Sequence, residues 1–404
     1  MLHHLKSKKI LNWCFFDFGI SSYPTLILTF FYGAYYSKYI AHNPTVGTSS
    51  WGFAISLASV FSFLIFAFLL VVGKSYFQFI SVNFFKVSFY IMGLSSATLI
   101  FFDKGSSQIL PLIVVIISFI SFEIVNFFYN FCLHKVSSRN SQGSVSNLGW
   151  GFGYLGGLIS LLLVFIWIKF SEGLDLFGVS PLLLVGPFVC FWSLIFGRKH
   201  FKNFQNERFN IPKITNFFSD VKSKKLTNFL FSYFFFNNAV ICIFAFASMF
   251  ASFLFGLTES EILFLGIFIN LFGIFGCYVL GRIDDKFGSL KNVKLCVCFL
   301  LICSLLLFFI KSILLFWLLA LTIGFFIGPI QASSRSVITK EIDSSNQLSA
   351  FALFSIFGNI CAILGPFLVG LVIDLTSSIR LGLLVIPIFL LMAMLILTSK
   401  LHIK

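Results

Sequence analysis

Two carboxylates lie inside long apolar runs of this sequence. Glu123 is followed by Asn126 and Asn130, and positions 123, 126 and 130 share one face of a helix. Asp17 lies near the start of another apolar run. An ionised carboxylate in hydrocarbon costs about 3 kcal/mol on insertion scales, so such a residue usually faces a polar cavity or a partner. We expect the Glu123 face to line a pathway for a solute or a proton. The alternatives are a hydrogen-bond network between helices for Glu123 and an ion pair with a surface lysine for Asp17.

Uncharged amides lie in further apolar runs. Asn237 and Asn238 share one run, and Gln331 ends another, one turn before Arg335. Amide side chains can orient a polar solute, and they can equally hold helices together. We place these four residues with Asp17 and the Glu123 face as candidates for the pathway.

A short polar segment between two apolar runs has the composition of a tight turn. It reads Gly281-Arg-Ile-Asp284-Asp285-Lys286-Phe-Gly288. An acidic residue there can pair with basic groups or with a helix N-terminus elsewhere, and so hold one conformation until the contact breaks. The segment is therefore a candidate gating loop, and a solvated turn is the alternative.

The sequence shows no signature of an enzyme, a cofactor or a metal. Gly151-Phe-Gly153-Tyr-Leu-Gly156-Gly157 spells the dinucleotide fingerprint, but no strand precedes it. Glycines in an apolar helix instead favour close helix packing. The nine cysteines lack metal-ligand spacing, and no HExxH motif, P-loop or nucleophile elbow is present.

The elements that carry these residues are long apolar helices. The chain is 58% hydrophobic and 10% charged, with a mean hydropathy of +1.00, whereas soluble domains carry about 25% charge. Lipid is therefore the expected solvent, and a span needs about 20 apolar residues. We predict an all-α membrane protein with twelve transmembrane helices, at 13–39, 51–73, 80–102, 108–131, 147–169, 180–197, 227–254, 261–281, 293–310, 312–331, 347–372 and 380–399.

Basic residues support this count and set an orientation. With twelve spans, both termini lie on one side, together with nearly all of the 28 lysines and arginines. The exceptions are Lys38, Lys104, Lys169, Lys311 and Arg380. The positive-inside rule makes that side cytoplasmic. This sorting accounts for the net charge of +14 without a nucleic-acid partner, and it predicts a multi-pass protein of the cell inner (plasma) membrane.

A basic polar stretch at 198–226 divides the chain into two sets of six spans. We predict an N-terminal six-helix bundle at 1–197, a cytoplasmic linker at 198–226 and a C-terminal six-helix bundle at 227–404. The connections 131–147 and 331–347 both carry basic residues and lead into glycine-containing spans, which indicates an internal repeat.

The segment 281–288 resembles the signature loop of the major facilitator superfamily, with Asp285 and Lys286 on its acidic and basic positions. Four further motifs resemble the vacuole-effluxer-like branch, which includes the fungal vacuolar amino-acid effluxers. In order along the chain these are Trp13–Ser21, Phe122-Glu123 with Tyr129-Asn130, Gly149–Gly157 and Gly328–Ser336. The chain departs from the branch at Ile20, at Asn238-Ala239 and at Gly73–Phe77, where a polar or acidic residue is lost.

The resemblance implies the major facilitator fold and alternating-access transport of a small polar solute, with amino-acid efflux as the specific hypothesis. We expect a monomer in the lipid bilayer, a small-molecule solute as its partner and no cofactor. The proton is a candidate coupling ion through Glu123, because burial favours the neutral form of a carboxyl group. A lipid flippase or membrane-embedded enzyme and a non-transporting scaffold are the alternatives.

Overall fold

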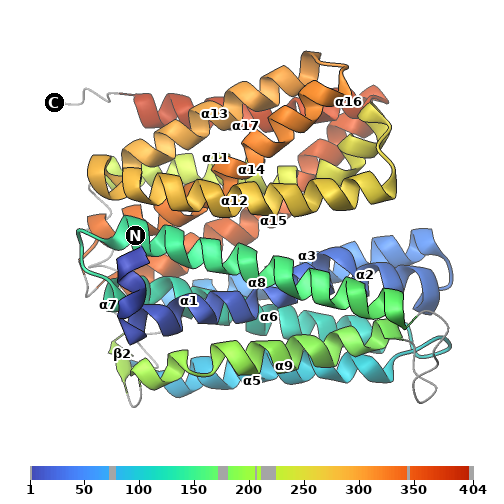
Figure 1. The fold of residues 1–404 in the computed structure, drawn as a ribbon, viewed down its shortest axis with the longest axis horizontal. Coiled ribbons are helices and arrows are strands. Elements are labelled where there is room, and N and C mark those ends of the chain that lie inside the picture. Colours follow the sequence, from blue (N-terminus) through green and yellow to red (C-terminus); the bar gives the residue numbers. More distant parts are fainter. Residues whose placement is uncertain are drawn as a thin grey trace. The chain divides into compact units, whose positions relative to one another are not determined.

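The computed structural model describes residues 2–71, 79–171, 181–204, 207–210, 224–343 and 346–399. Helices account for almost all of them, as the sequence predicts (Figure 1). The chain folds into two compact units. We call Leu2–Cys132 with Phe152–Ile211 the N-unit, and Leu133–Gly151 with Pro212–Lys404 the C-unit. About half of the predicted linker at 198–226 lies outside the described residues, so the predicted domain boundaries stay a prediction.

The N-unit holds the helices of the first half of the sequence. Its α5 packs against α6 and α9, α3 packs against α6, and a short antiparallel pair joins β1 to β2. Its elements are η1 Leu2–Lys6, α1 Lys8–Ile20, η2 Pro24–Phe30, α2 Tyr32–Tyr35, η3 Tyr36–Ile40, α3 Pro44–Val71, β1 Phe79–Ser81, α5 Val82–Thr98, η4 Leu99–Phe101, α6 Ile109–Phe131, most of α8 Gln142–Phe170, η5 Pro181–Leu184, α9 Val185–Gly197, η6 His200–Phe204 and β2 Arg208–Asn210.

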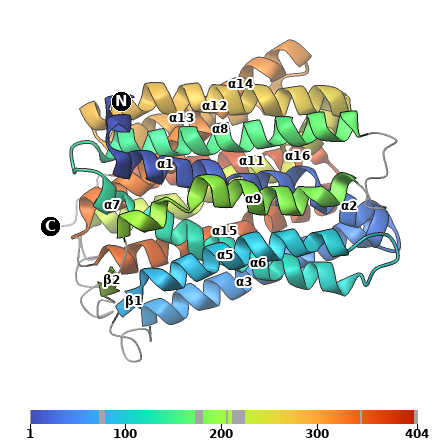
Figure 2. The ribbon, with the colours of Figure 1, turned by 60° about the horizontal axis from the view of Figure 1, so that its bottom comes forward.

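The C-unit holds the helices of the second half, together with the first ten residues of α8. Here α14 packs against α12 and α13, and α11 packs against α15 and α17 (Figure 2). Its further elements are α7 Leu133–Val136, α11 Lys224–Phe255, α12 Glu259–Phe287, α13 Ser289–Phe309, α14 Ile313–Glu341, α15 Gln347–Thr376, α16 Ile379–Leu383 and α17 Val385–Thr398.

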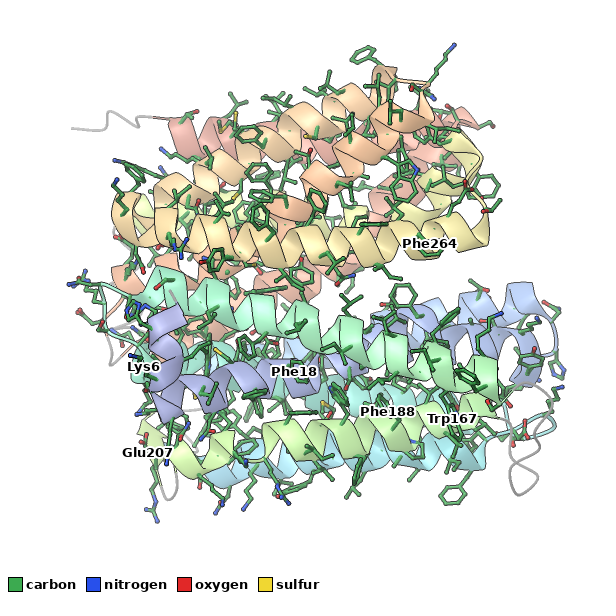
Figure 3. The ribbon with its side chains drawn as sticks, in the orientation of Figure 1. Lys6, Phe18, Trp167, Phe188, Glu207 and Phe264 are labelled. Carbon is green, nitrogen blue, oxygen red and sulfur yellow. The ribbon has the colours of Figure 1, made fainter. Side chains whose placement is uncertain are left out.

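Eleven helices in the described residues are long and apolar enough to cross a membrane. A shorter apolar helix, Leu182–Gly197, stands where the sequence predicts the sixth span. Large apolar side chains cover the outside of the helices, and Figure 3 shows carbon-rich side chains along both units. Phe170 is 81% exposed, and the labelled Phe264 is 58% exposed. Exposing so much apolar surface to water would be unfavourable, whereas exposing it to lipid is not.

The first span is longer and less regular than predicted. It runs from Lys8 to Ile40 and contains two π-helical segments, η2 and η3. Single π turns inside α-helices often mark functional positions. Just before η2, the Tyr23 hydroxyl lies 2.7 Å from the Ser118 hydroxyl of α6, in the same unit as Glu123.

The glycine-rich segment of α8 serves helix packing, as the sequence predicts. A Cβ atom at Gly156 would lie 2.1 Å from the backbone oxygen of Phe18 in α1. Only glycine allows the two backbones to approach this closely. The segment is helical throughout, so the dinucleotide interpretation is excluded.

An aromatic cluster at one end of the N-unit encloses His200 completely. Its ring centroid lies 4.7 Å from that of Phe16, 5.2 Å from Phe204 and 5.7 Å from Phe128. Neither ring nitrogen has a hydrogen-bond partner among the described residues. Burial, with a smaller effect of the Lys9 charge, lowers the pKa of His200 to about 3.

His200 therefore predicts a pH dependence of stability. The unfolded chain takes up a proton near the ordinary histidine pKa of 6.5, whereas the folded chain does so only near 3. The free energy of unfolding should fall as pH drops through this window, by about 1.4 kcal/mol per pH unit. Thermal denaturation in detergent between pH 7 and pH 4 should show a flatter profile for His200→Phe than for the wild type. Equal profiles would contradict the prediction.

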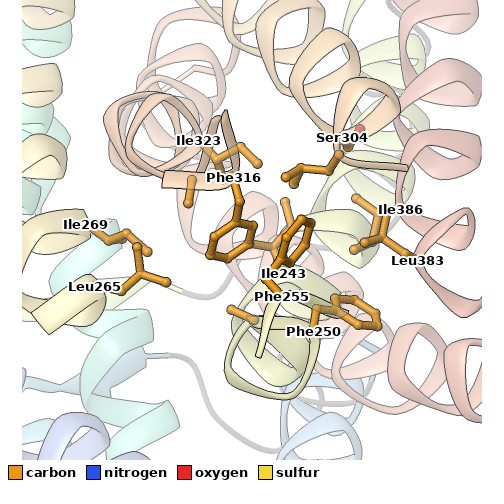
Figure 4. A pocket seen from close by; sticks show the side chains of 13 residues that line it. Ile243, Phe250, Phe255, Leu265, Ile269, Ser304, Phe316, Ile323, Leu383 and Ile386 are labelled. Carbon is orange, nitrogen blue, oxygen red and sulfur yellow. The ribbon is translucent and has the colours of Figure 1, made fainter. Parts of the chain in front are cut away.

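The C-unit contains an apolar cavity of about 60 Å³ (Figure 4). Apolar side chains from α11, α12, α14, α16 and α17 surround it, and α13 adds Leu307 and Ser304. Ala320 of α14 lines the cavity, whereas Ala332 of the same helix does not, although it is fully buried. An empty apolar cavity lowers the free energy of unfolding by about 24 cal/mol per Å³, so this cavity lowers it by about 1 kcal/mol.

Filling the cavity should stabilise the C-unit. We expect Ala320→Leu to raise the melting temperature, corresponding to about 1 kcal/mol. Ala332→Leu enlarges a fully buried residue on the same helix away from this cavity, and should cost about 1–3 kcal/mol through overpacking. Thermal denaturation of both variants checks the pair, and a loss of similar size at both positions would contradict it.

Candidate functional site

Glu123, Asn126 and Asn130 lie on α6 of the N-unit. Glu123 and Asn126 are half-buried, and Asn130 is buried. The Glu123 carboxylate acts electrostatically on the Tyr23 phenol, whose hydroxyl bonds to Ser118. The Tyr23 phenol of the first span thus lies within electrostatic range of the predicted carboxylate, and Ser118 of α6 bonds to that phenol. Tyr23 and Ser118 were not among the residues predicted from the sequence, because two single polar residues so far apart carry no pattern.

Asp17 lies against a different neighbour. It is half-buried, and its carboxylate accepts a hydrogen bond of 3.2 Å from the Ser21 hydroxyl one turn later. A Cβ atom at Gly153 of α8 would lie 3.0 Å from this carboxylate. Asp17 therefore faces the interior of the N-unit, between α1 and α8.

The structure separates the predicted amides of α11. The Asn237 side-chain oxygen accepts a hydrogen bond of 2.9 Å from the Gln331 amide of α14. Asn238 instead donates to the Phe234 carbonyl and, at 3.0 Å, to the Cys361 sulfur of α15. Asn237 and Gln331 thus form a polar pair in the C-unit, whereas Asn238 holds α11 against α15.

Arg335 belongs to another cluster than the amides. It is almost fully buried in the C-unit and donates hydrogen bonds to the hydroxyl and the backbone oxygen of Ser146, at 3.2 and 2.9 Å. Its guanidinium also lies over the Trp150 ring, 5.5 Å from the centroid. Arg335 therefore binds the first part of α8 to α14.

The predicted gating loop is mostly helical. Residues 281–287 form the last two turns of α12, and the chain turns only at Gly288, where φ is 96°. A positive φ costs glycine little, so the break between α12 and α13 falls there. Lys286 points out to solvent over Phe287. The related segment at Gly73–Phe77 lies outside the described residues.

Asp284 is the buried centre of this region. Its carboxylate accepts hydrogen bonds from Ser289 at 2.5 Å and from the Lys340 ammonium at 3.3 Å. Lys340 also lies 4.0 Å from the Asp285 carboxylate and donates to Ser289. Sequence analysis missed Lys340, because it lies 56 residues from Asp284 and no local pattern links the two.

The same carboxylates lie against the N-terminus of α8. A Cβ atom at Gly143 would lie 2.1 Å from one oxygen of Asp284 and 2.7 Å from one oxygen of Asp285. The positive end of the α8 dipole therefore favours both charges. Arg139, just before α8, donates to the Lys340 backbone oxygen at 2.9 Å. We call Asp284, Asp285, Lys340 and the first turn of α8 the latch.

No group of three or more His, Cys, Asp or Glu side chains suited to a metal ion occurs among the described residues. All nine cysteines are free thiols. The polar groups described above can form ionic contacts and hydrogen bonds. They are the carboxylate face and the amide pair within the spans, and the latch at one end of the C-unit.

Comparison with known proteins agrees with this architecture. Residues 175–366 match the family model for the Major Facilitator Superfamily. An uncharacterized MFS-type transporter, YxiO of Bacillus subtilis, is 22% identical over 395 residues, covering 92% of this chain and 90% of the relative. Autophagy-related protein 22 of Pichia angusta is 30% identical over 168 residues, covering 39% of this chain and 30% of that protein.

Solved structures share the fold over nearly the whole chain. The proton:xylose symporter XylE superposes with a TM-score of 0.70 at 12% identity, over 96% of this chain and 94% of that one. A bacterial homologue of the iron transporter ferroportin, in its outward-facing state, gives 0.71 at 11% identity, over 96% and 97%. The chain is thus similar in part of its sequence, and in its fold, to the major facilitator superfamily, whereas its matches to autophagy-related protein 22 are partial.

Breaking the latch should loosen the start of α8. Lys340→Met leaves Asp284 buried without its cation, which typically costs about 3 kcal/mol or more. We expect faster amide hydrogen exchange in residues 142–151, measured by mass spectrometry. Lys286→Met removes an exposed lysine that lies two residues after Asp284 in α12, and it serves as the control. Equal exchange in both variants would rule out the latch.

Proposed function

We propose that this chain, which has the fold of the major facilitator superfamily, carries a small polar solute across a membrane by alternating access. The observation that carries the proposal is the Glu123 face of α6. A carboxylate and two amides lie inside one of the most apolar parts of a chain whose fold is that of solute carriers. Polar groups at such a depth usually face a cavity or a partner, and a polar solute or a proton is the partner that we propose for this face.

A second polar element supports the same function. Asn237 and Gln331 pair across α11 and α14 of the C-unit. An amide pair offers both a donor and an acceptor to a solute. With the Glu123 face in the N-unit, each unit would then present polar groups from within its spans.

The latch supplies a contact that an alternating-access cycle needs to form and break. It consists of ionic and helix-dipole contacts at one end of the C-unit. Ionic contacts of this kind can break and re-form, which suits a switch between two states.

Amino-acid efflux is the specific hypothesis, and it depends on the resemblance to the vacuole-effluxer-like branch and on the partial matches to autophagy-related protein 22. We place the protein in the cell inner (plasma) membrane, with both termini and the latch on the cytoplasmic side, because nearly all lysines and arginines sort to that side. The proton remains our candidate coupling ion.

Flux in proteoliposomes tests the function. Purified protein should exchange a labelled solute from a panel of amino acids, sugars and nucleosides, and a flippase or a scaffold should not. For a solute that is transported, Glu123→Gln should lower the rate by about tenfold or more, equivalent to one lost charge-assisted hydrogen bond of about 1.5–3 kcal/mol.

The matched control is Asp374→Asn, which neutralises an exposed carboxylate in the last turn of α15. It should transport like the wild type. Normal flux through Glu123→Gln would remove Glu123 from the pathway, and absence of flux for every solute in the wild type would remove the transport proposal.

A further inference from the structure

We propose that the C-unit binds one small monovalent cation, such as Na⁺, in a site built from oxygens of α12, α13 and the first turns of α8. The site lies behind the latch. It is separate from the Glu123 face and from the Asn237–Gln331 pair.

The first observation is a surplus of acceptor oxygens. Among the described residues, four buried side-chain oxygens in this region have no hydrogen-bond partner: Oδ2 of Asp284 and Oδ1 of Asp285, Asn147 and Asn292. Asp284 and Asn147 are 0% exposed, and Asn292 is 1% exposed. A buried acceptor without a donor lowers the stability of the folded protein by about 1–3 kcal/mol. Several such acceptors together indicate a ligand that accepts lone pairs.

The two amides have fixed orientations. The nitrogen of Asn292 donates to the Ser333 hydroxyl at 2.8 Å and to the Leu280 carbonyl at 3.3 Å. The nitrogen of Asn147 donates to the Gly143 carbonyl at 2.9 Å. Flipping either amide would break these bonds, so in both residues the oxygen is the atom left for a ligand.

Shared neighbours connect the residues that carry these oxygens. The Ser333 hydroxyl, which Asn292 contacts, also interacts with the Asp284 carboxylate. On the opposite side, Asp284 touches α8 at Gly143, one helical turn before Asn147. Asp284 is thus linked to Asn292 through Ser333 and contacts α8 one helical turn before Asn147.

The charge of the region selects a monovalent ion. The charged groups that act on Asp284 are Lys340 and Asp285. Two carboxylates and one ammonium leave one negative charge. Arg335, which donates to Ser146, and Arg139, which donates to the Lys340 backbone oxygen, are not among the charges that act on Asp284, and Lys286 is exposed. One monovalent cation would neutralise the remainder, whereas a divalent cation would leave an excess positive charge in a buried place.

The ligand atoms select a hard ion. Carboxylate, amide and hydroxyl oxygens suit alkali and alkaline-earth cations, whereas transition metals prefer imidazole and thiolate. In the folded C-unit such an ion would bridge α12, α13 and α8. Its binding should therefore stabilise the latched arrangement by mass action.

Thermal denaturation of the purified full-length protein tests the site. Titrations with NaCl, KCl and choline chloride at constant ionic strength separate binding from general salt effects. We expect a saturable rise in melting temperature with Na⁺ or K⁺ relative to choline. The same melting temperature in all three salts would overturn the proposal, and so would a saturable rise with CaCl₂ alone.

Variants assign any shift to this site. Asn292→Leu should abolish the cation-dependent rise. Asn270→Leu removes an amide that donates to a backbone oxygen four residues earlier in α12, as Asn147 does in α8, and should keep the rise. Retention of the rise in Asn292→Leu would place the ion elsewhere and overturn the proposal.

Asn292→Asp tests the charge argument and remains informative if the leucine variant fails to fold. It adds one negative charge, so the preferred ion should change from monovalent to divalent. The variant should then show a larger saturable shift with CaCl₂ than with NaCl. An unchanged preference would contradict the site. These measurements need no transport, so they stand whether or not solute flux is found.

Discussion

Hydrocarbon offers no hydrogen bonds, and this constraint explains most of the structure. Every backbone N–H and C=O within a span has to find its partner inside the protein, and a continuous helix supplies all of these partners locally. The described chain is accordingly helical nearly throughout, and its only strands are two three-residue segments between spans. The apolar side chains that cover the helices are the outer surface that lipid requires.

The same constraint makes each polar group within a span informative. A side chain such as Asn238 or Arg335 persists in an apolar helix only with partners, and here these partners hold α15 and α8 in place. The Glu123 face and the Asn237–Gln331 pair are the polar groups that we propose for a solute. One lies in each unit, which suits a carrier with two moving parts and supports our proposed function.

A close backbone contact allows charged side chains of α12 to lie against α8. Because Gly143 has no side chain, the carboxylates of Asp284 and Asp285 can reach the first turn of α8. Without that approach, Asp284 would have Lys340 and hydroxyl groups but no helix dipole nearby. The latch, and the oxygen-rich site that we propose behind it, both follow from this single small residue.

The sequence by itself determined the solvent, the helical class and the number of apolar helices, because these depend on local composition and on the length needed to cross a bilayer. It also identified Glu123 and Asp17 as unusual, since a carboxylate in an apolar run is visible without a structure, and it placed Asp284 in a candidate gating loop. Only the tertiary structure decided their partners. Lys340, Ser289 and Gly143 reach Asp284 through helix packing, and packing depends on contacts between residues far apart in sequence. For the same reason the sequence grouped Arg335 with Gln331, which is its neighbour along α14, whereas the fold assigns it to Ser146.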